Sequence, residues 1–172
     1  MSVSAIAQRR TAQTGGPIRV AVVTASDTRT AEDDTGGDII MEKVASAGHV
    51  VVHREIVRDD PALIGELLDR IVETTDAQVV LVTGGTGISP RDTTYDAIAA
   101  RLEKTLPGFG ELFRMLSFDE VGAAAMLSRA VAGAYRGRAV FSVPGSPNAV
   151  RLAMDRLIVP EMAHLVWELH RE

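Results

Sequence analysis

The sequence predicts an α/β fold in which a mostly parallel sheet carries helices on both faces. The first observation is that continuous apolar runs of strand type alternate with segments whose apolar residues have helical spacing. The second is that small or acidic residues follow the apolar runs, at the carboxyl ends where such sheets bind ligands. With 172 residues and a hydrophobic content of 46%, the chain has the size of one domain.

Four strands are predicted, because strands buried on both faces give near-continuous apolar runs. They cover residues 18–27, 49–57, 77–85 and 137–145. After the first strand we expect a polar loop over residues 28–37 and a helix over residues 38–48, with Gly48 just past the helix end.

The second helix is expected to begin at Pro61, with Asp60 as its N-cap. Its predicted apolar face consists of Leu63, Leu67, Leu68 and Ile71. A third helix is predicted over residues 93–104, where Thr93 and Asp96 have the spacing of a capping-box variant.

Residues 108–133 are less regular. We expect short helices there, around residues 109–116, and a further segment that ends near Ala132. Residues 146–170 read as a closing helix with Ser146 as its cap, and Pro160 is expected to kink or break it.

Composition excludes several classes of function. The formal net charge of −5 argues against sequence-independent nucleic-acid binding, which needs a basic surface. The absence of cysteine excludes disulfides and cysteine chemistry, and it is compatible with the cytoplasmic location that we expect. The four histidines read as structural, and no apolar run is long enough to cross a membrane. We expect residues 1–17 to form a mobile tail and residues 18–172 a single domain.

The run Val79–Asp92 carries the strongest chemical signal. Gly84, Gly85 and Gly87, with Thr86, allow bare backbone N–H groups to approach a phosphate or carboxylate. A tight turn without a ligand explains this loop about equally well. The loop has neither the spacing of a dinucleotide fingerprint nor the Lys-Ser/Thr of a nucleotide-triphosphate loop.

Acidic residues flank this loop. Asp92 follows it, and Asp59 and Asp60 follow the second strand, where Asp60 reads as the helix cap and Asp59 as the spare acid. Two carboxylates beside a phosphate site make chemical sense when a divalent metal joins them to the phosphate. The residues therefore indicate a site for a magnesium-nucleotide, although both acids also suit simple helix entry.

Further candidates stand at the other strand ends. Ser26 and Asp27 could bind a second anion, and the turn of Pro144, Gly145 and Ser146 leads into a helix N-terminus. Each group also has an ordinary structural interpretation as strand-end polarity or helix capping. Ser128 with Arg129, and Arg114 within "FRML", are weaker candidates, because isolated arginines are usually solvated surface charges.

Five motifs occur in an order that carries a family resemblance, and together they span about Arg19 to Trp167. They are "VTASDTRT", "LVTGGTGISPRDTTYDAI", "PGFGELFRMLSF", "LSRAVAG" and "VPGSPNAV". In this order they resemble the MoaB/Mog family of molybdenum cofactor biosynthesis proteins.

The resemblance implies a three-layer α/β/α molybdopterin-binding fold and a homo-oligomer, either a trimer or a hexamer. It also implies binding of molybdopterin, a pterin with a terminal phosphate. Mog-type members adenylylate that phosphate with Mg-ATP and release pyrophosphate, which prepares the pterin for metal insertion by a MoeA-type partner. The alternative is a non-catalytic molybdopterin-binding or carrier protein with the same pocket.

By the resemblance, Asp59 and Asp92 are the catalytic acids and hold Mg²⁺, with Asp60 left open as the alternative to Asp59. The Gly84–Gly87 loop would cradle phosphates. Ser26, Asp27 and Ser128 would line the pterin or phosphate pocket, and Pro144–Ser146 would close its edge. The compact "LPGFGE" connection is closer to the MoaB branch and "PGSPNAV" to the Mog branch, so the branch stays open.

Overall fold

The computed structural model describes residues 16–171, so the predicted tail lies almost entirely outside the described residues. One six-stranded sheet has the order β2-β1-β3-β6-β5-β4. Neighbouring strands among β2, β1, β3 and β6 run parallel, whereas β5 and β4 add to one edge in antiparallel fashion. The strands are β1 (Arg19–Ala25), β2 (Val50–Val57), β3 (Val79–Gly84), β4 (Lys104–Thr105), β5 (Val131–Tyr135) and β6 (Arg138–Val143).

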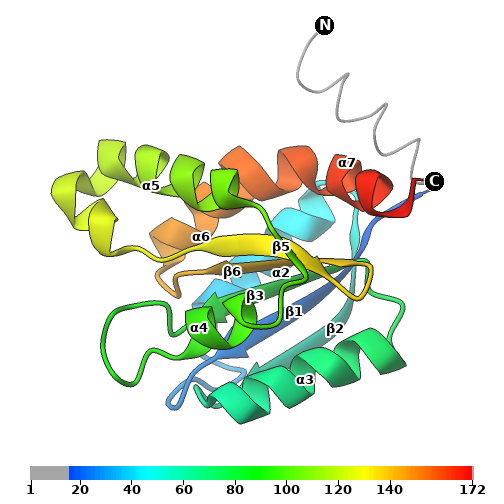
Figure 1. The fold of residues 1–172 in the computed structure, drawn as a ribbon, viewed down its shortest axis with the longest axis horizontal. Helices are drawn as coiled ribbons and strands as arrows, with labels where there is room; N and C mark the ends of the chain where they lie inside the picture. Colours follow the sequence, from blue (N-terminus) through cyan, green and yellow to red (C-terminus); the bar gives the residue numbers. More distant parts are fainter. Residues whose placement is uncertain (1–15, 172) are drawn as a thin grey trace, which may run out of the picture.

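Helices cover both faces of the sheet and complete a three-layer α/β/α arrangement (Figure 1). One layer holds α2, α5, α6 and α7, and the opposite layer holds α3 and α4. The helical segments are α2 (Thr35–Ser46), α3 (Pro61–Thr74), α4 (Thr94–Ala99), α5 (Pro107–Val121), the 3₁₀ turn η1 (Gly122–Leu127), α6 (Pro147–Ala153), the π-helical turn η2 (Met154–Ile158) and α7 (Val159–His170).

The two cores explain why the strands read as continuous apolar runs. Along β1, Val20 and Val22 belong to the core under α2, α5, α6 and α7, whereas Ala21 and Val23 belong to the core under α3 and α4. Successive side chains of a strand point to opposite faces. Both faces are covered here, so every position along the strand must be apolar.

The helix starts follow the capping rules. Asp60 accepts hydrogen bonds from the N–H groups of Ala62 and Leu63, and Pro61 occupies the first turn of α3. Ser146 likewise caps α6 by accepting from the N–H of Ala149. Both capping predictions are confirmed. Leu63, however, is 40% exposed, so its place on the buried face of α3 was wrong, and Ile64 is buried instead.

The region predicted as irregular differs most from expectation. Residues 107–121 form one helix, α5, and the segment expected to end near Ala132 instead contains a strand, β5. A tight turn at Arg136 and Gly137, both with positive φ, pairs β5 with β6 as a hairpin. The prediction missed β5 because its alanine-rich sequence has helical propensity, which the pairing with β6 overrides.

Three other predictions also differ from the structure. The helix predicted over residues 93–104 ends at Ala99, and Lys104 belongs to β4. The α2 helix begins at Thr35 and not at Asp38, because Asp34 caps it. The closing helix is not broken at Pro160. It passes through the π-helical turn η2 just before this residue, so the helix continues where a proline would otherwise clash with the preceding turn. Among residues 16–171, no helix has the length and apolarity that a bilayer crossing requires.

Candidate functional site

The ends of β1, β3 and β6 meet at one edge of the sheet because these strands run parallel. They form a pocket of about 200 Å³. Its lining residues come from the three strand ends and from the start of α2: Thr24, Ala25, Ser26, Arg29, Asp34, Gly36, Thr83, Gly84, Gly85 and Gly145. The structure therefore brings together three of the four strand ends that the sequence singled out.

Glycine is required at the back of this pocket. Gly84 has φ +124°, and a Cβ atom there would stand 2.0 Å from the carbonyl oxygen of Ala25. Gly85 has φ +26°, and its Cβ would stand 1.8 Å from Asp59 Oδ2. Side-chain-bearing residues rarely adopt such φ values. Gly84 and Gly85 therefore bring the backbone close to the floor of the pocket and to Asp59.

Asp59 holds the loop that follows β3. Its Oδ1 accepts hydrogen bonds from the Thr93 backbone N–H at 3.2 Å, the Thr93 hydroxyl at 2.8 Å and the Thr94 hydroxyl at 3.0 Å. Thr93 is the N-cap residue of α4, yet its side chain makes no capping bond, so the predicted capping box was wrong. The threonine that suggested the box is bound to Asp59 instead.

Asp92 lies in the same loop, immediately before Thr93. Its Oδ2 accepts the Ser89 backbone N–H at 3.1 Å, and its own N–H donates to the Ser89 carbonyl at 2.9 Å. A Cβ on Gly87 would come within 2.6 Å of Asp92 Oδ2. Asp92 thus lies in the loop after β3, and Asp59, from the connection between β2 and α3, is hydrogen-bonded to that loop. Neither acid is among the residues that line the pocket, and Asp60 caps α3.

The expected Mg²⁺ would need oxygen ligands from Asp59 and Asp92. Within residues 16–171, no three His, Asp or Glu side chains form a metal-binding group. Mg²⁺ usually needs only one or two carboxylates together with substrate phosphates. In this described part of the chain, Asp59 Oδ2 and Asp92 Oδ1 accept no hydrogen bond. Each acid therefore keeps one carboxylate oxygen for a ligand, and together they do not form a closed metal site of their own.

The two arginines named by the sequence differ in their surroundings. The Arg129 guanidinium donates to the carbonyls of Thr86, Gly87 and Asp92 at 3.0, 2.7 and 3.3 Å. It also pairs with Asp96 and lies over the ring of Tyr95, with 4.6 Å to the ring centroid. Arg129 therefore clamps the glycine loop, and its charge is already committed to the protein.

The side chain of Arg114 is half-buried on α5. Within residues 16–171 it makes no hydrogen bond and no ion pair. It lines a different pocket, which lies between α4, α5 and the start of β5.

Two charged residues that line the pocket, Arg29 and Asp34, were missed by the sequence reading. Asp34 is 1% exposed and accepts from the Thr24 hydroxyl and from the Gly37 N–H. The Arg54 guanidinium donates a hydrogen bond to Asp34 Oδ2 at 2.8 Å. This hydrogen bond raises the pKa of the Arg54 guanidinium. The signal was present, because aspartate is among the preferred N-cap residues, but the segment "DDTGG" was assigned to a loop.

The other predicted residues take positions around the pocket. Ser26 lines it, and its hydroxyl oxygen accepts the N–H groups of Thr28 and Arg29. Asp27 does not line the pocket but lies 3.7 Å from Arg58. Ser128 ends η1 outside the lining.

Thr86 is buried, with its carbonyl bound to Arg129. At the end of β6, the Pro144 carbonyl accepts the Thr83 hydroxyl, Gly145 lines the pocket, and Ser146 caps α6.

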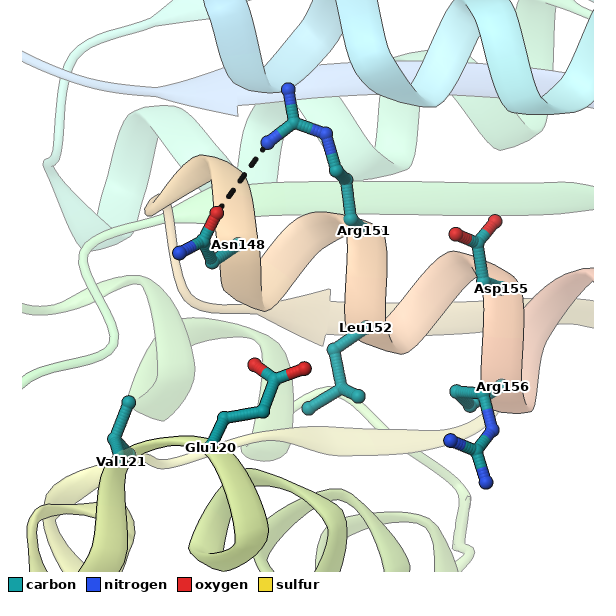
Figure 2. Close-up of a pocket in the computed structure, with 7 residues that line it drawn as sticks. All are labelled: Glu120, Val121, Asn148, Arg151, Leu152, Asp155 and Arg156. Atoms are coloured by element: carbon teal, nitrogen blue, oxygen red, sulfur yellow. Dashed lines mark hydrogen bonds between the residues drawn. The ribbon is translucent and has the colours of Figure 1, made fainter.

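A larger groove of about 550 Å³ lies elsewhere, between the end of α5 and the helix that α6 begins (Figure 2). Figure 2 shows Glu120 on one side and Asn148 bonded to Arg151 on the other. None of the residues predicted for the site lines this groove. Its side chains are mostly exposed and of mixed charge, so the chemistry favours the smaller pocket at the strand ends.

Comparison with known proteins identifies the family to which the chain is similar. Residues 21–164 match the family described as "Probable molybdopterin binding domain". Molybdenum cofactor biosynthesis protein B of Bacillus cereus is 49% identical over 156 residues, which cover 90% of this chain and 92% of that protein.

Two solved structures share the whole architecture. A crystal structure of a Molybdenum cofactor biosynthesis protein B has a TM-score of 0.88 at 49% identity and covers 91% of this chain and 98% of its own. The tungsten cofactor synthesizing protein MoaB from Pyrococcus furiosus has a TM-score of 0.79 at 36% identity, with 90% and 98% covered. Because the family match spans most of the residues and these relatives cover nearly the full fold, the chain belongs to the molybdopterin-binding domain family of molybdenum cofactor biosynthesis proteins.

Proposed function

We propose that the chain binds molybdopterin and adenylylates its terminal phosphate with Mg-ATP. In this reaction a phosphate oxygen of molybdopterin attacks the α-phosphorus of ATP, a new P–O bond forms, and the bond to the β-phosphate oxygen breaks to release pyrophosphate. The observation that carries the proposal is that Asp92 lies in the loop after β3 and that Asp59, from the β2–α3 connection, is hydrogen-bonded to that loop, whose glycines line a pocket of about 200 Å³.

The proposed reaction requires no general base from a side chain. The nucleophile is already an anion at neutral pH, so no histidine or cysteine base is required. The protein must bring two anionic substrates together and balance their charge. We assign the Gly84–Gly87 loop to the phosphates and Asp59 and Asp92 to the magnesium ion that neutralises them. Ser26 and Gly145 contribute polar and backbone groups to the lining of the same pocket.

Residues outside the lining take supporting roles in this proposal. Asp27 and Ser128 remain candidates for the outer rim, where the part of the substrate beyond the phosphate would lie. Pro144 and Ser146 shape the turn that presents Gly145. Arg129 acts through the loop it clamps and not through its charge.

The test is anaerobic incubation with molybdopterin, ATP and Mg²⁺, followed by mass spectrometry for adenylyl-molybdopterin. We expect Asp59→Asn and Asp92→Asn to lower turnover at least about tenfold, as for loss of one electrostatic contributor. An asparagine oxygen can still accept the bonds that Asp59 receives, so the fold should survive.

Asp60→Asn is the matched control for the transferase assay. Asp60 caps α3, and an asparagine oxygen caps a helix as well, so both stability and turnover should persist. Wild-type turnover in Asp92→Asn would remove this acid from the mechanism.

The alternative is a molybdopterin carrier with the same pocket. A carrier has no need of ATP, so the two functions differ in one measurement. Magnesium-dependent ATP binding supports the transferase. Tight molybdopterin binding with neither ATP binding nor product supports the carrier and assigns the chemistry to another protein.

We also propose a cytoplasmic homo-oligomer, a trimer or hexamer, that passes its product to a MoeA-type partner. The support is a row of exposed apolar side chains along α5 and η1: Leu112, Met115, Phe118, Val121, Met126 and Leu127, between 46% and 78% exposed. Apolar rows of this kind mark contact surfaces between proteins. Light scattering after size-exclusion chromatography gives the subunit number, and Phe118→Asp should reduce it if this face is the contact.

A further inference from the structure

We infer that Arg129 is a positioning residue, which fixes the Asp92 carboxylate relative to Asp59 by holding the peptide group that joins Asp92 to Thr93. This inference deepens the proposed function and rests on it for the role of the two acids. The contact of Arg129 with Asp92 is to the backbone carbonyl oxygen. Its effect on the reaction is therefore indirect, through the place that Asp92 takes.

The loop from Thr86 to Asp92 is an arch whose base Arg129 closes. Residues 88–91 are exposed to solvent, whereas Thr86 is buried and Asp92 is half-buried. At the base, Arg129 Nε donates to the Thr86 carbonyl at 3.0 Å. One terminal nitrogen of the same guanidinium donates to the carbonyls of Gly87 and Asp92, at 2.7 and 3.3 Å. A single side chain thus joins the first residues of the arch to its last residue.

The peptide group between Asp92 and Thr93 is held from both sides. Its carbonyl oxygen accepts from Arg129 at 3.3 Å, and its N–H donates to Asp59 Oδ1 at 3.2 Å. A peptide group is planar and includes the Cα atoms at both ends. A contact at its oxygen and another at its nitrogen therefore restrain the Asp92 Cα atom. The separation of the two acids is set through this peptide group, and Arg129 holds the side opposite Asp59.

The Asp92 side chain moves with the base of the arch. Its Oδ2 accepts the Ser89 N–H at 3.1 Å, and its own N–H donates to the Ser89 carbonyl at 2.9 Å. These two bonds orient the carboxylate within the arch, but both of their ends belong to the arch itself. A shift of the base therefore displaces the free Oδ1 atom of Asp92 without breaking either bond.

The clamp requires an arginine in this orientation. The third nitrogen of the guanidinium, Nη1, pairs with Asp96 at 2.9 Å, and the plane lies over the Tyr95 ring with 4.6 Å to the centroid. A lysine ammonium is a compact point charge on a flexible stem and has no planar fork of donors. Arg129→Lys therefore keeps the positive charge and removes the simultaneous contacts with three carbonyls.

The first test is hydrogen exchange of the full-length protein without ligands, followed by mass spectrometry. We expect Arg129→Lys to exchange at least about tenfold faster over residues 86–94, while α7 exchanges as in wild type. The matched control is Asp96→Asn, whose amide oxygen can still accept from Arg129, and its loop should exchange like wild type. Unchanged exchange over the loop in Arg129→Lys would overturn the inference. Faster exchange over the whole chain would also overturn it, because Arg129 would then only stabilise the fold.

The second test measures how turnover depends on the Mg²⁺ concentration. Arg129→Lys should raise the concentration for half-maximal turnover about tenfold, the usual effect of losing a group that orients a metal-binding carboxylate. In the Asp92→Asn background, Arg129→Lys should have little further effect, because the group that Arg129 positions is already lost. Equal effects of Arg129→Lys in the two backgrounds would contradict positioning through Asp92.

The outcomes separate this inference from the proposed function. If wild type forms no adenylyl product while exchange of the loop depends on Arg129, the transferase proposal fails and the positioning of Asp92 stands. If wild type forms product while Arg129→Lys matches it in loop exchange and in Mg²⁺ requirement, the positioning role is wrong and the transferase stands.

Discussion

The backbone polar groups at the two ends of the parallel strands differ in whether the protein itself satisfies them. At the amino end the chain satisfies itself: the Ile18 N–H donates to His49 Nδ1 and the Arg19 N–H to Gln78 Oε1, both at 3.2 Å. At the carboxyl end, the backbone at Gly84 and Gly85 lines an open pocket with carboxylates beside it. The same strands therefore end in satisfied hydrogen bonds on one side and in an open pocket on the other, and the loop residues make the difference.

The largest effect is expected for Gly84→Ala. The new Cβ would overlap the Ala25 carbonyl, and φ +124° strains any side-chain-bearing residue. Backbone must move in β1 or β3, so we expect a loss of about 4 kcal/mol in unfolding free energy, or failure to fold. Urea denaturation measures it. A loss below about 1 kcal/mol would show that the carboxyl end tolerates rearrangement.

Asp34→Ala is expected to cost about 3 kcal/mol, because it leaves the buried Thr24 hydroxyl and the Gly37 N–H without their acceptor and removes a buried partner of Arg54. The control is Asp38→Ala. Asp38 pairs with the same arginine at 2.8 Å but is mostly exposed, so its loss should cost about 0.5 kcal/mol. Equal losses in both variants would mean that burial of Asp34 adds nothing.

Gly48→Ala tests a glycine with positive φ near the amino ends of the strands, for comparison with Gly84→Ala. Gly48 also has a positive φ, +79°, but a Cβ there would meet nothing within 4 Å. Only the backbone strain remains, and we expect a loss of about 1 kcal/mol by urea denaturation. Gly48→Ala and Gly84→Ala together separate the cost of left-handed backbone from the cost of close approach. A Gly48→Ala loss as large as that of Gly84→Ala would refute this separation.

The smallest effect at neutral pH is expected for His49→Gln. Burial lowers the pKa of His49 below its usual 6.5, so below that pH the unfolded chain binds a proton that the folded chain resists. The contribution of this group to stability is therefore complete above pH 6.5 and declines as the pH falls toward the folded-state pKa. Glutamine can still accept the Ile18 N–H. Wild type should lose more stability than His49→Gln between pH 7 and 5, and parallel curves would contradict this.

The parts of the fold that depend on local rules could be predicted from the sequence. Strand composition identified β1, β2, β3 and β6, and capping chemistry identified Asp60 and Ser146. The missed strand β5 depends on its pairing with β6, a long-range influence on an alanine-rich segment. Its one local signal was the Arg136–Gly137 turn, where an arginine occupies a position that usually favours asparagine, aspartate or glycine.

The candidate site shows the same division. The strand-end rule pointed to Ser26, Gly84, Gly85 and Gly145, and these four residues line one pocket. It could not show that Asp34 reaches the pocket, because that depends on how α2 begins. Nor could it separate Arg129 from Arg114, since the difference lies in carbonyls and a tyrosine ring supplied by a distant loop. Roles for individual side chains require the tertiary contacts.

The sheet topology has a consequence for assembly of the molecule. The β5–β6 hairpin is closed by a tight turn, so its loop-closure entropy is small and it can form from a short piece of chain. The pairing of β3 with β6, which joins Val79 to Ala139, must close a long stretch of chain, and such contacts form slowly. The pocket at the strand ends is formed only where β1, β3 and β6 end together. It therefore exists only after the slowest pairings are complete, and a chain cut before β6 lacks the Gly145 wall.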